Sequence, residues 1–552
     1  MDRREVLVRG KWMPLAPGET FASLFEKVRR PGEREAMVAR VKNELQELSS
    51  HVWPGVEVDF LDYTDPDGRR VYGRSLSLLM LKAIRDLMGN VPVVIEHTIH
   101  RNYYCEFCDT SVAVTQQRLE AIKKRMQELV AADLPIGKET MRVSRAICIA
   151  KEQGMETKAR LFGYRKASNI NMYCLDGFYD YFYGYMLPRT GYLTSFDLVA
   201  YERGFLLVCP DAKDPEQLSS YAHFEKISHV FMEQLDWSRL MGVDNVADLN
   251  DIIVRGEFED LVLVNEALHE KKISQIADTI TARKGALKVV LIAGPSSSGK
   301  TSFAQRLGIA LRVNGLYPHT IGLDDYFIDR SKTPLDSEGK PDFESIDALD
   351  LPVFQRDLAA LLKGEEIETP CYNFVLGVRE YRGRKLRLGP DDILLVEGIH
   401  GLNDRLTETI PEEQKFRIFI SAMTQLNVDD HNRISTSDSR LLRRIVRDHQ
   451  FRGSSAAKTI SSWPSVKRGE EKNIFPYQEN ADVMFNSTTI YELSVLKNYV
   501  EPLLYQITPE QEEYVTAKRM MKFLDYFLAA NCDVVPRNSI LKEFLGGSAL
   551  HV

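Results

Sequence analysis

The sequence lacks long hydrophobic runs, a surplus of positive charge and a large number of cysteines. No stretch approaches the roughly 18 uninterrupted apolar residues of a membrane span, and the start has no apolar segment typical of a signal peptide. Seven cysteines in 552 residues indicate neither a disulfide framework nor a metal-rich protein. The net charge of −8 disfavours non-specific nucleic-acid binding, because phosphate contacts need surplus Lys and Arg. We therefore expect a cytoplasmic, globular protein without membrane contact.

The hydrophobic pattern changes along the chain. Residues 1 to about 66 combine short alternating segments with a helical one, which predicts a small α+β unit. Residues 164–205 are rich in aromatic side chains, and residues 216–285 have mostly helical spacing. From residue 287 to about 505, buried-strand runs alternate with amphipathic helices, the pattern of a parallel α/β sheet, and a helical tail follows.

The strongest motif is a complete phosphate-binding loop, Gly294-Pro-Ser-Ser-Ser-Gly299-Lys300-Thr301, between an apolar strand pattern and a helical one. Its glycines allow backbone N–H groups to surround phosphate oxygens at a helix N-terminus. Lys300 is expected to neutralise the β- and γ-phosphates, and the Thr301 hydroxyl to hold Mg²⁺. The predicted ATP-binding residues of this segment are Gly294, Pro295, Ser296, Ser297, Ser298, Gly299, Lys300, Thr301 and Ser302.

Carboxylates end two further apolar strand patterns, at Asp324-Asp325 and at Glu397. The carboxyl ends of strands in an open α/β sheet border the ligand crevice. Asp324 is therefore the predicted catalytic base, which accepts the proton of an attacking hydroxyl. Glu397 is predicted to help Thr301 hold Mg²⁺. The alternatives are that the two Asp residues cap a turn and that Glu397 is simply solvated.

A basic helix is predicted at residues 439–448, where four arginines at i, i+3, i+4 and i+7 share one face. Such a face repels itself unless anions neutralise it, and Arg binds phosphate in a bidentate manner. A lid that closes on triphosphate explains the pattern, and a solvated helix paired to Asp438 and Asp448 is the alternative. The arginines are Arg440, Arg443, Arg444 and Arg447, of which the last three are assigned to ATP, and Arg452 beyond them is assigned to the substrate.

Together these motifs resemble the uridine kinase and phosphoribulokinase family of P-loop kinases over residues 286–505. The resemblance rests on the phosphate loop and, in order, on Leu323–Phe327, Pro341–Asp350, Tyr372-Asn-Phe374, Val396–Gly398 and Arg443–Asp448. It implies an α/β P-loop kinase with a doubly wound parallel sheet that uses ATP and Mg²⁺. It also implies that Lys300 and Asp324 are catalytic, that Asp347 or Asp342 binds a sugar, and that Tyr372 packs on a nucleobase.

One position departs from the family pattern. Uridine kinases have a base-contacting His five residues after the Tyr, whereas this chain has Gly377. Sites that form such hydrogen bonds discriminate strongly between substrates, and sites without them do not. The kinase assignment is unaffected, but the identity of the base is left open.

The N-terminal half resembles the accessory domains of threonyl-tRNA synthetase. Residues 1–68 are similar to its ubiquitin-like TGS domain, and residues 69–215 to its editing domain, through Gly73–Leu87, Tyr103–Phe107 and Pro188–Gly191. The two are expected to be smaller α+β domains, followed by a helical connector (216–285), the kinase domain (286–505) and a helical tail (506–552). The positions that match the metal ligands of the editing domain hold Arg74, Leu78, Phe182 and Met186. Because none is a usable ligand, we expect this half to bind or regulate.

The favoured function is an ATP-dependent kinase for a nucleoside 5′-hydroxyl. A kinase for another sugar-containing acceptor is an alternative, and a phosphorylated acceptor would need cations such as Arg379, Arg382, Arg384 or Lys385. A second class is an RNA-linked regulator that binds tRNA through the N-terminal half, which the acidic composition disfavours. A degenerate scaffold is disfavoured by the intact Lys300, Thr301, Asp324 and Glu397. Related kinases often assemble, so a homo-oligomer is one option that the sequence leaves open.

Overall fold

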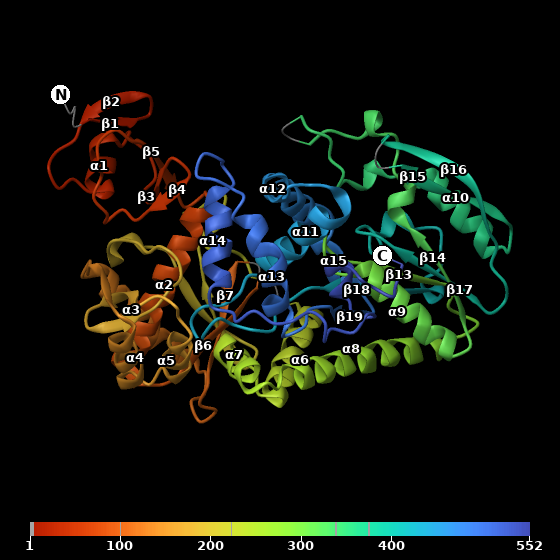
Figure 1. Ribbon diagram of the computed structural model, residues 1–552, viewed down its shortest axis with the longest axis horizontal. Helices are drawn as coiled ribbons and strands as arrows, with labels where there is room; N and C mark the ends of the chain where they lie inside the picture. Colours follow the sequence, from red (N-terminus) through yellow and green to blue (C-terminus); the bar gives the residue numbers. More distant parts are fainter. Residues whose placement is uncertain (1–4, 100, 222–223, 337–338, 374–375, 552) are drawn as a thin grey trace.

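The computed structural model describes residues 5–99, 101–221, 224–336, 339–373 and 376–551. Figure 1 shows the N-terminal modules at one end of an elongated molecule and a second α/β unit at the other, with C-terminal helices between them. Within the described residues, no helix combines the length and apolar content needed to cross a bilayer.

The first module is a mixed five-stranded sheet with one helix and its own hydrophobic core. The sheet order is β2-β1-β5-β3-β4, in which β1 pairs parallel to β5. The helix begins with a capping box, because the Thr20 and Ser23 side chains bond each other's backbone N–H groups. The elements are β1 (Glu5–Val8), β2 (Lys11–Pro14), α1 (Phe21–Val28), β3 (Ala36–Val41), β4 (Glu44–Gln46) and β5 (Glu57–Asp62).

The second module is built around one long, buried helix, α2 (Pro66–Met88), which Asp65 caps and Pro66 starts. Two antiparallel sheets surround it, with orders β11-β12-β7-β6 and β10-β9-β8. The strands are β6 (Val93–Ile99), β7 (Asn102–Phe107), β8 (Ile136–Arg142), β9 (Asn169–Leu175), β10 (Phe178–Asp180), β11 (Asp197–Tyr201) and β12 (Gly204–Val208). The remaining helices are α3 (Gln116–Ala131), α4 (Val143–Glu152) and α5 (Glu156–Gly163).

The third unit contains a parallel sheet of order β14-β17-β13-β18-β19. Residues of β13 alternate between two cores, because Val290 and Ile292 pack on one face and Val289 and Leu291 on the other. Helices therefore cover both faces, and the expected doubly wound sheet is confirmed. The strands are β13 (Val289–Ala293), β14 (Tyr317–Gly322), β17 (Asp392–Glu397), β18 (Lys415–Ser421) and β19 (Val483–Asn486), with the hairpin β15 (Ile367–Asn373) and β16 (Val378–Leu386). The helices are α9 (Lys300–Val313), α10 (Leu351–Leu362), α11 (Thr436–Arg452), α12 (Ala456–Asn473) and α13 (Glu492–Leu504).

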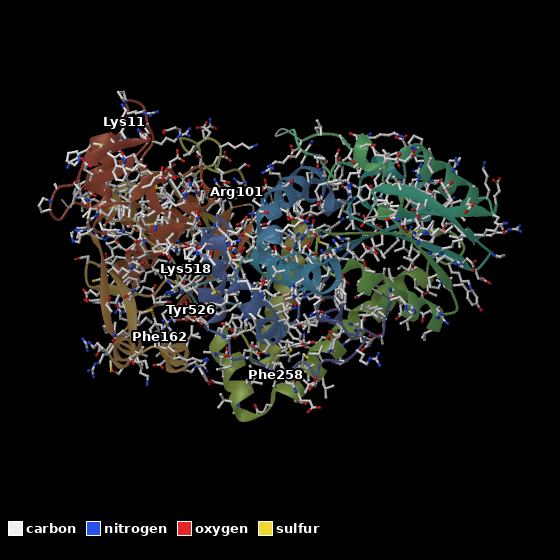
Figure 2. The ribbon with its side chains drawn as sticks, turned by 45° about the horizontal axis from the view of Figure 1, so that its top comes forward. Lys11, Arg101, Phe162, Phe258, Lys518 and Tyr526 are labelled. Atoms are coloured by element: carbon white, nitrogen blue, oxygen red, sulfur yellow. The ribbon has the colours of Figure 1, made fainter. Side chains whose placement is uncertain are left out.

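The connector and the tail join the two halves through a shared core. One hydrophobic cluster contains Phe162 of the second module, Ile273 of the connector, Phe303 of α9 and Phe523 of the tail. Figure 2 labels Phe162 and Tyr526 within this junction. The connector helices are α6 (Glu225–Met241), α7 (Val246–Arg255) and α8 (Phe258–Thr281), and those of the tail are α14 (Tyr514–Leu524) and α15 (Lys542–Leu545).

A buried charge network crosses the same junction. Lys158 of α5 forms an ion pair with Asp180 and lies 3.5 Å from Asp429, a residue that precedes α11. His431 Nδ1 lies 2.7 Å from the second oxygen of Asp180. Burial raises the pKa of Asp180, but Lys158 and His431 outweigh it and lower the pKa to about 2. The two halves thus share charges that are fully paired only when they are docked.

Removing the Lys158 amine is predicted to destabilise the whole molecule. Lys158→Ala leaves Asp180 and Asp429 buried without a full counter-charge, so we expect a loss of about 3–5 kcal/mol in the free energy of unfolding. Chemical denaturation followed by circular dichroism measures it. Lys151→Ala, which removes an exposed lysine of α4, should stay within about 0.5 kcal/mol of the unmodified protein. Equal effects of the two variants would contradict this role for Lys158.

Candidate active site

The predicted phosphate loop connects β13 to α9 at the carboxyl edge of the parallel sheet. Ser297 and Gly299 have positive φ angles, of 59° and 79°. A Cβ atom at position 294 would lie 2.2 Å from the Ile420 carbonyl oxygen, so only glycine fits there. The loop therefore curls tightly over the N-terminus of α9, a geometry that presents backbone N–H groups to an anion.

Three carboxylates surround Lys300, which itself donates to the Pro295 carbonyl oxygen at 3.3 Å. Asp324 follows β14 and Glu397 ends β17, and these strands are neighbours in register, with Gly322 opposite Glu397. Burial raises the pKa of Asp324, of Glu397 and of a third acid, Glu344, and the charge of Lys300 opposes this rise in each of them. The structure thus brings the two predicted acids together with the loop lysine.

Burial dominates the electrostatics of these acids. It raises the pKa of Asp324, against the opposing effects of Lys300, Arg452 and Arg447. Burial, aided by Asp324, also raises the pKa of Glu397 to about 7 despite the charge of Lys300. Buried carboxylates with raised pKa values are stabilised in their ionised form by a bound cation.

Thr301 and Glu397 are the residues positioned to hold Mg²⁺. The Thr301 hydroxyl donates to Glu397 Oε1 at 3.2 Å. A hydroxyl and a carboxylate are oxygen donors of the kind that Mg²⁺ prefers. The residues present therefore fit the Mg²⁺ ion expected from the sequence, and its positive charge would favour the ionised form of Glu397.

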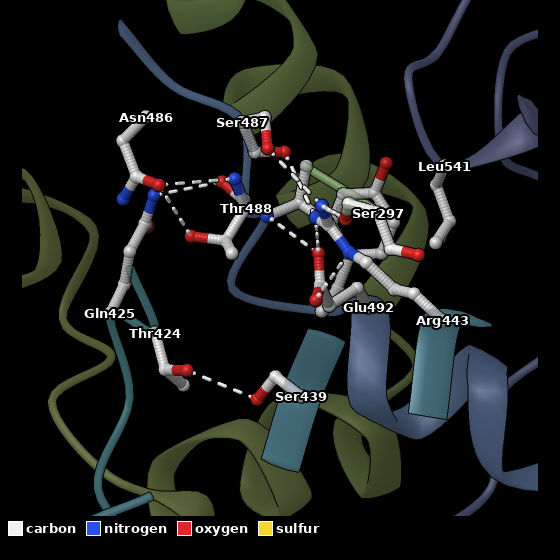
Figure 3. Close-up of polar contacts among 12 residues, drawn as sticks. Ser297, Thr424, Gln425, Ser439, Arg443, Asn486, Ser487, Thr488, Glu492 and Leu541 are labelled. Atoms are coloured by element: carbon white, nitrogen blue, oxygen red, sulfur yellow. Dashed lines mark hydrogen bonds and ion pairs between the residues drawn. The ribbon is translucent and has the colours of Figure 1, made fainter. Parts of the chain in front are cut away.

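Arg440 and Arg443, the first two arginines of α11, are bound to protein groups and are not free to bind phosphate as expected from the sequence. Arg443 is 1% exposed, and its guanidinium donates to Glu492 Oε1 at 3.1 Å, to Ser487 and to the Ser297 carbonyl oxygen (Figure 3). Arg440 forms a buried ion pair with Glu470 and donates to the Ser296 carbonyl oxygen at 2.9 Å. This corrects the expectation that Arg443 faces ATP. Protein carboxylates already neutralise both arginines, which hold the loop in place.

The remaining arginines of this face lie closer to the predicted reaction centre. Arg444 donates to the Ser296 hydroxyl at 2.8 Å and pairs with Asp448 at 3.2 Å. Arg447 also pairs with Asp448, at 3.0 Å. Arg452 is 57% exposed, 3.8 Å from the same carboxylate. Arg447 and Arg452 both lower the pKa of Asp324, so they are near enough to act on charge that develops there.

Glu344, in the Pro341–Asp350 segment, is an acid that the sequence did not single out, and the charges of Asp324 and Lys300 both act on it. Asp347, the acid that the family resemblance assigns to the acceptor, is 61% exposed and pairs with exposed Arg405 at 2.8 Å. One Glu344 carboxylate oxygen is buried without a hydrogen-bond partner. Burial, reinforced by Glu470, raises the pKa of Glu344 to about 7.

Tyr372 and Gly377 lie in the β15–β16 hairpin beside Asp324. The Tyr372 backbone N–H donates to Asp325 Oδ1 at 3.1 Å, and its ring packs edge-on against Phe327 at 5.7 Å. Asp325 therefore holds the hairpin. Gly377 has a φ of +70°, and a Cβ there would lie 2.9 Å from Arg330 Cβ. A histidine at this position would be strained and would displace Arg330. Phe374 of the same motif lies outside the described residues.

Comparison with known proteins separates the two halves of the chain. Residues 289–494 match the model of the Phosphoribulokinase / Uridine kinase family. The C-terminal half carries a P-loop kinase domain of this family. A uridine kinase of Halobacterium salinarum is 28% identical over 194 residues, which are 35% of this chain and 77% of that enzyme. The solved structure of a possible uridine kinase from Bacillus stearothermophilus matches 39% of this chain and 98% of its own, at 19% identity and a TM-score of 0.28.

The N-terminal half is similar to threonine–tRNA ligases, so the chain is a fusion of two kinds of module. The ligase of Syntrophotalea carbinolica is 32% identical over 176 residues, which are 31% of this chain and 28% of that enzyme. The chain spans about a third or less of the length of these ligases, 28% to 34% in the first six matches.

The expected ligand positions of the editing-like module lie in its core. Leu78, Phe182 and Met186 are buried, and Arg74 Nε donates to the Tyr185 carbonyl oxygen at 3.0 Å. In the part of the chain that the structure describes, no group of three His, Cys, Asp or Glu side chains is arranged to hold a metal ion. The aromatic residues around position 182 are thus part of a filled core.

The tail of the chain covers the start of α9 in the kinase domain. Glu543 of α15 accepts hydrogen bonds from the Ser302 backbone N–H at 3.2 Å and from its hydroxyl at 2.8 Å. Ile540 lies against Gly299, since a Cβ there would be 2.4 Å from Ile540 Cγ2. The Phe544 ring stacks 5.1 Å from the Arg443 guanidinium. A carboxylate therefore occupies a donor pair that the sequence assigns to ATP.

Removing the Glu543 carboxylate is predicted to tighten ATP binding. Hydrogen bonds to charged groups contribute about 1.5–3 kcal/mol, and 1.4 kcal/mol is tenfold in affinity. We expect Glu543→Ala to lower the Kd for ATP about tenfold, as measured by isothermal titration calorimetry. Asp533→Ala removes an exposed carboxylate of the same tail and should leave the Kd unchanged. Weaker ATP binding by Glu543→Ala would show that the carboxylate supports the site instead.

The raised pKa of Glu344 predicts a pH dependence of stability. Its pKa of about 7 lies above the ordinary value of 4.5, so between these values the folded protein binds more protons than the unfolded chain. The free energy of unfolding should then fall as pH rises from 5 to 8. Glu344→Gln should reduce this fall in denaturant titrations across that range, whereas Glu365→Gln, at an exposed position, should not. An identical pH profile for both variants would argue against the buried, protonated Glu344.

Proposed function

We propose that the chain transfers the γ-phosphoryl group of ATP to a hydroxyl of a sugar-containing small molecule, with a nucleoside 5′-hydroxyl as the favoured acceptor. Membership of a kinase family supports phosphoryl transfer. The observation that carries the proposal is the convergence of Lys300, Asp324 and Glu397 at one edge of the sheet.

Asp324 is the proposed general base. It is buried beside Lys300, and the raised pKa that burial gives it favours acceptance of a proton from the acceptor hydroxyl. Lys300, Arg447 and Arg452 place positive charge around the position where the phosphoryl group would move. Mg²⁺, held through Thr301 and Glu397, would supply further positive charge to the phosphate oxygens.

The acceptor is proposed to bind between Glu344 and the hairpin that carries Tyr372. A buried carboxylate oxygen without a partner is suited to accept hydrogen bonds from sugar hydroxyls. The family resemblance assigns Tyr372 to the base; its side chain is 6% exposed and packs against Phe327. The glycine at position 377 provides no side chain for hydrogen bonding to that base, so we expect broad or altered base preference.

A phosphorylated acceptor is less well supported. Arg379 pairs with Asp350 at 2.8 Å, Arg382 with Glu380 at 2.7 Å and Lys385 with Glu366 at 2.8 Å. Most of the cations that would bind a second phosphate are thus already neutralised, which favours an uncharged sugar.

The catalytic assignment predicts a large loss of turnover without the base. General base catalysis contributes about 10²–10⁴-fold, so Asp324→Asn should lower kcat by that factor with little change in the KM for ATP. Lys300→Ala should abolish turnover. The assay follows ADP formation with Mg²⁺ against a panel of nucleosides, ribulose 5-phosphate and tRNA. Turnover stimulated by tRNA alone and unaffected by Asp324→Asn would replace the kinase with an RNA-linked ATPase.

The acceptor assignment predicts different effects for two neighbouring acids. Above pH 7, where the Glu344 carboxylate is ionised, Glu344→Gln should raise the KM for the acceptor about tenfold or more, because a charged hydrogen bond contributes about 1.5–3 kcal/mol. Asp347→Asn, whose partner is the exposed Arg405, should leave KM within about twofold. The reverse pattern would restore Asp347 as the sugar ligand.

A further inference from the structure

A cavity of about 380 Å³ lies between the two halves of the molecule, away from the acceptor site. Its walls come from α2, β6 and β7 of the ligase-like half and from the start of α11 and the C-terminal part of α12 in the kinase domain. Figure 2 labels Arg101, one of its lining residues, between these parts. The volume is within the usual range for small-molecule sites.

The lining of this cavity is strongly basic, with more cations than carboxylates. The cations are Arg69, Arg70, Arg101, Arg433, Arg440 and Lys467. The carboxylates are Glu96, Glu470 and Glu471, of which Glu470 pairs with Arg440 and Glu471 with Arg101 at 3.3 Å. Burial raises the pKa of Glu96 to about 8, so this acid carries little charge at neutral pH.

Three of the cations, Arg69, Arg433 and Lys467, form no ion pair with a carboxylate of the described chain. Arg433 lies over the Tyr103 ring at 5.6 Å, and Arg69 donates to the carbonyl oxygens of Tyr63 and Thr64. Burial, together with the charge of Arg70, lowers the pKa of Lys467. Positive charges that are held together out of water favour an anion between them.

The N-terminus of α11 opens into the same cavity through residues 434–437. Ser435 is its N-cap, but its side chain makes no capping hydrogen bond. The first backbone N–H groups of this 17-residue helix and its dipole therefore add to the attraction for an anion supplied by Arg433 and Lys467.

We propose that this cavity binds a small phosphorylated molecule, with its phosphate held by Arg433, Lys467 and the start of α11. The geometry suits a phosphate, because Arg offers bidentate donors and Lys a compact charge. The volume of about 380 Å³ suits a metabolite-sized ligand.

Two residues that line the cavity also contact the phosphate loop of the kinase domain. Arg440 and Glu470 line it, and they also hold Ser296, whose N–H donates to Glu470 Oε1 at 3.0 Å and whose carbonyl oxygen accepts from Arg440 at 2.9 Å. An anion that competes with Glu470 for Arg440 changes the support of the loop. Binding here therefore alters ATP affinity, and ATP alters binding here by the same factor. This coupling rests on the proposed function, whereas the site itself does not.

The site is tested by titrating the full chain with inorganic phosphate and with phenyl phosphate in a chloride buffer. A Lys300→Ala background weakens the phosphate loop, so the remaining binding reports the cavity. We expect saturable binding that Lys467→Ala and Arg433→Ala each weaken at least tenfold. Lys472→Ala removes an exposed lysine at the end of the same helix and should change the Kd less than twofold. Circular dichroism checks that each variant folds. If one of them does not fold, Arg101→Ala, at a more exposed position, provides a further test.

Three results would overturn the site. The first is loss of all binding in Lys300→Ala, which would assign it to the phosphate loop. The second is unchanged binding in both Lys467→Ala and Arg433→Ala. The third is tRNA binding that depends on these two residues while neither phosphate probe binds, which would make the surface a nucleic-acid site.

The coupling is tested separately by the Kd for ATP with and without saturating phenyl phosphate. We expect a several-fold shift in the unmodified protein and a smaller one in Lys467→Ala. Equal shifts in both would show direct competition at the loop and would refute coupling. A chain that binds phenyl phosphate through Lys467 but phosphorylates no acceptor would refute the kinase proposal and leave the cavity assignment standing.

Discussion

The requirement that a charge removed from water be paired governs much of this structure. Lys158 and Asp180 contact Asp429 and His431 across the junction of the two halves, and Arg440 with Glu470 fixes the phosphate loop. Arg443, paired with Glu492, holds the same loop through its hydrogen bond to the Ser297 carbonyl oxygen (Figure 3). Breaking such a pair costs far more than an exposed one, because the remaining ion cannot regain its hydration. These pairs make the loop a rigid platform before any nucleotide arrives.

The two halves of the chain pack against each other and are not separate domains joined by a free linker. In the part of the chain that the structure describes, the buried apolar residues of α7, α8 and the tail belong to the cluster that also holds the second module and α9, and Val230 of α6 packs in another cluster with β18 and β19. Glu543 reaches the first turn of α9 from 241 residues away in sequence. Changes in the ligase-like half therefore have a mechanical route to the kinase domain through side chains that are already in contact.

The sequence was informative where chemistry depends on local spacing. The phosphate loop is contiguous, and the convergence of Asp324 and Glu397 follows because parallel strands end at the same edge of a sheet. Spacing also placed four arginines on one face of α11, but it could not show that Glu470 and Glu492, on other helices, would neutralise Arg440 and Arg443.

The acceptor acid and the tail contact were beyond sequence reasoning for a related reason. Glu344 and Asp347 are three residues apart in a segment without regular periodicity around a short 3₁₀ turn, so which of them faces Asp324 depends on the path of the backbone. No local signal indicates that Glu543 meets Ser302, because the contact arises from the docking of distant elements. The sequence showed that Gly377 departs from the family pattern. It did not show that this residue has a positive φ and that Arg330 packs over it.

Two regions of the structure hold charged side chains that lack a full set of partners, and both are places where a bound ligand would complete the pairing. Around Lys300, burial raises the pKa of Asp324, Glu344 and Glu397, so a bound cation would favour their ionised forms. In the cavity between the halves the excess is positive and includes Lys467. Arg440 and Glu470 stand between these two regions and touch both. Binding of a cation at the first region or of an anion at the second would stabilise the fold, and each ligand would then act on the loop that the two regions share.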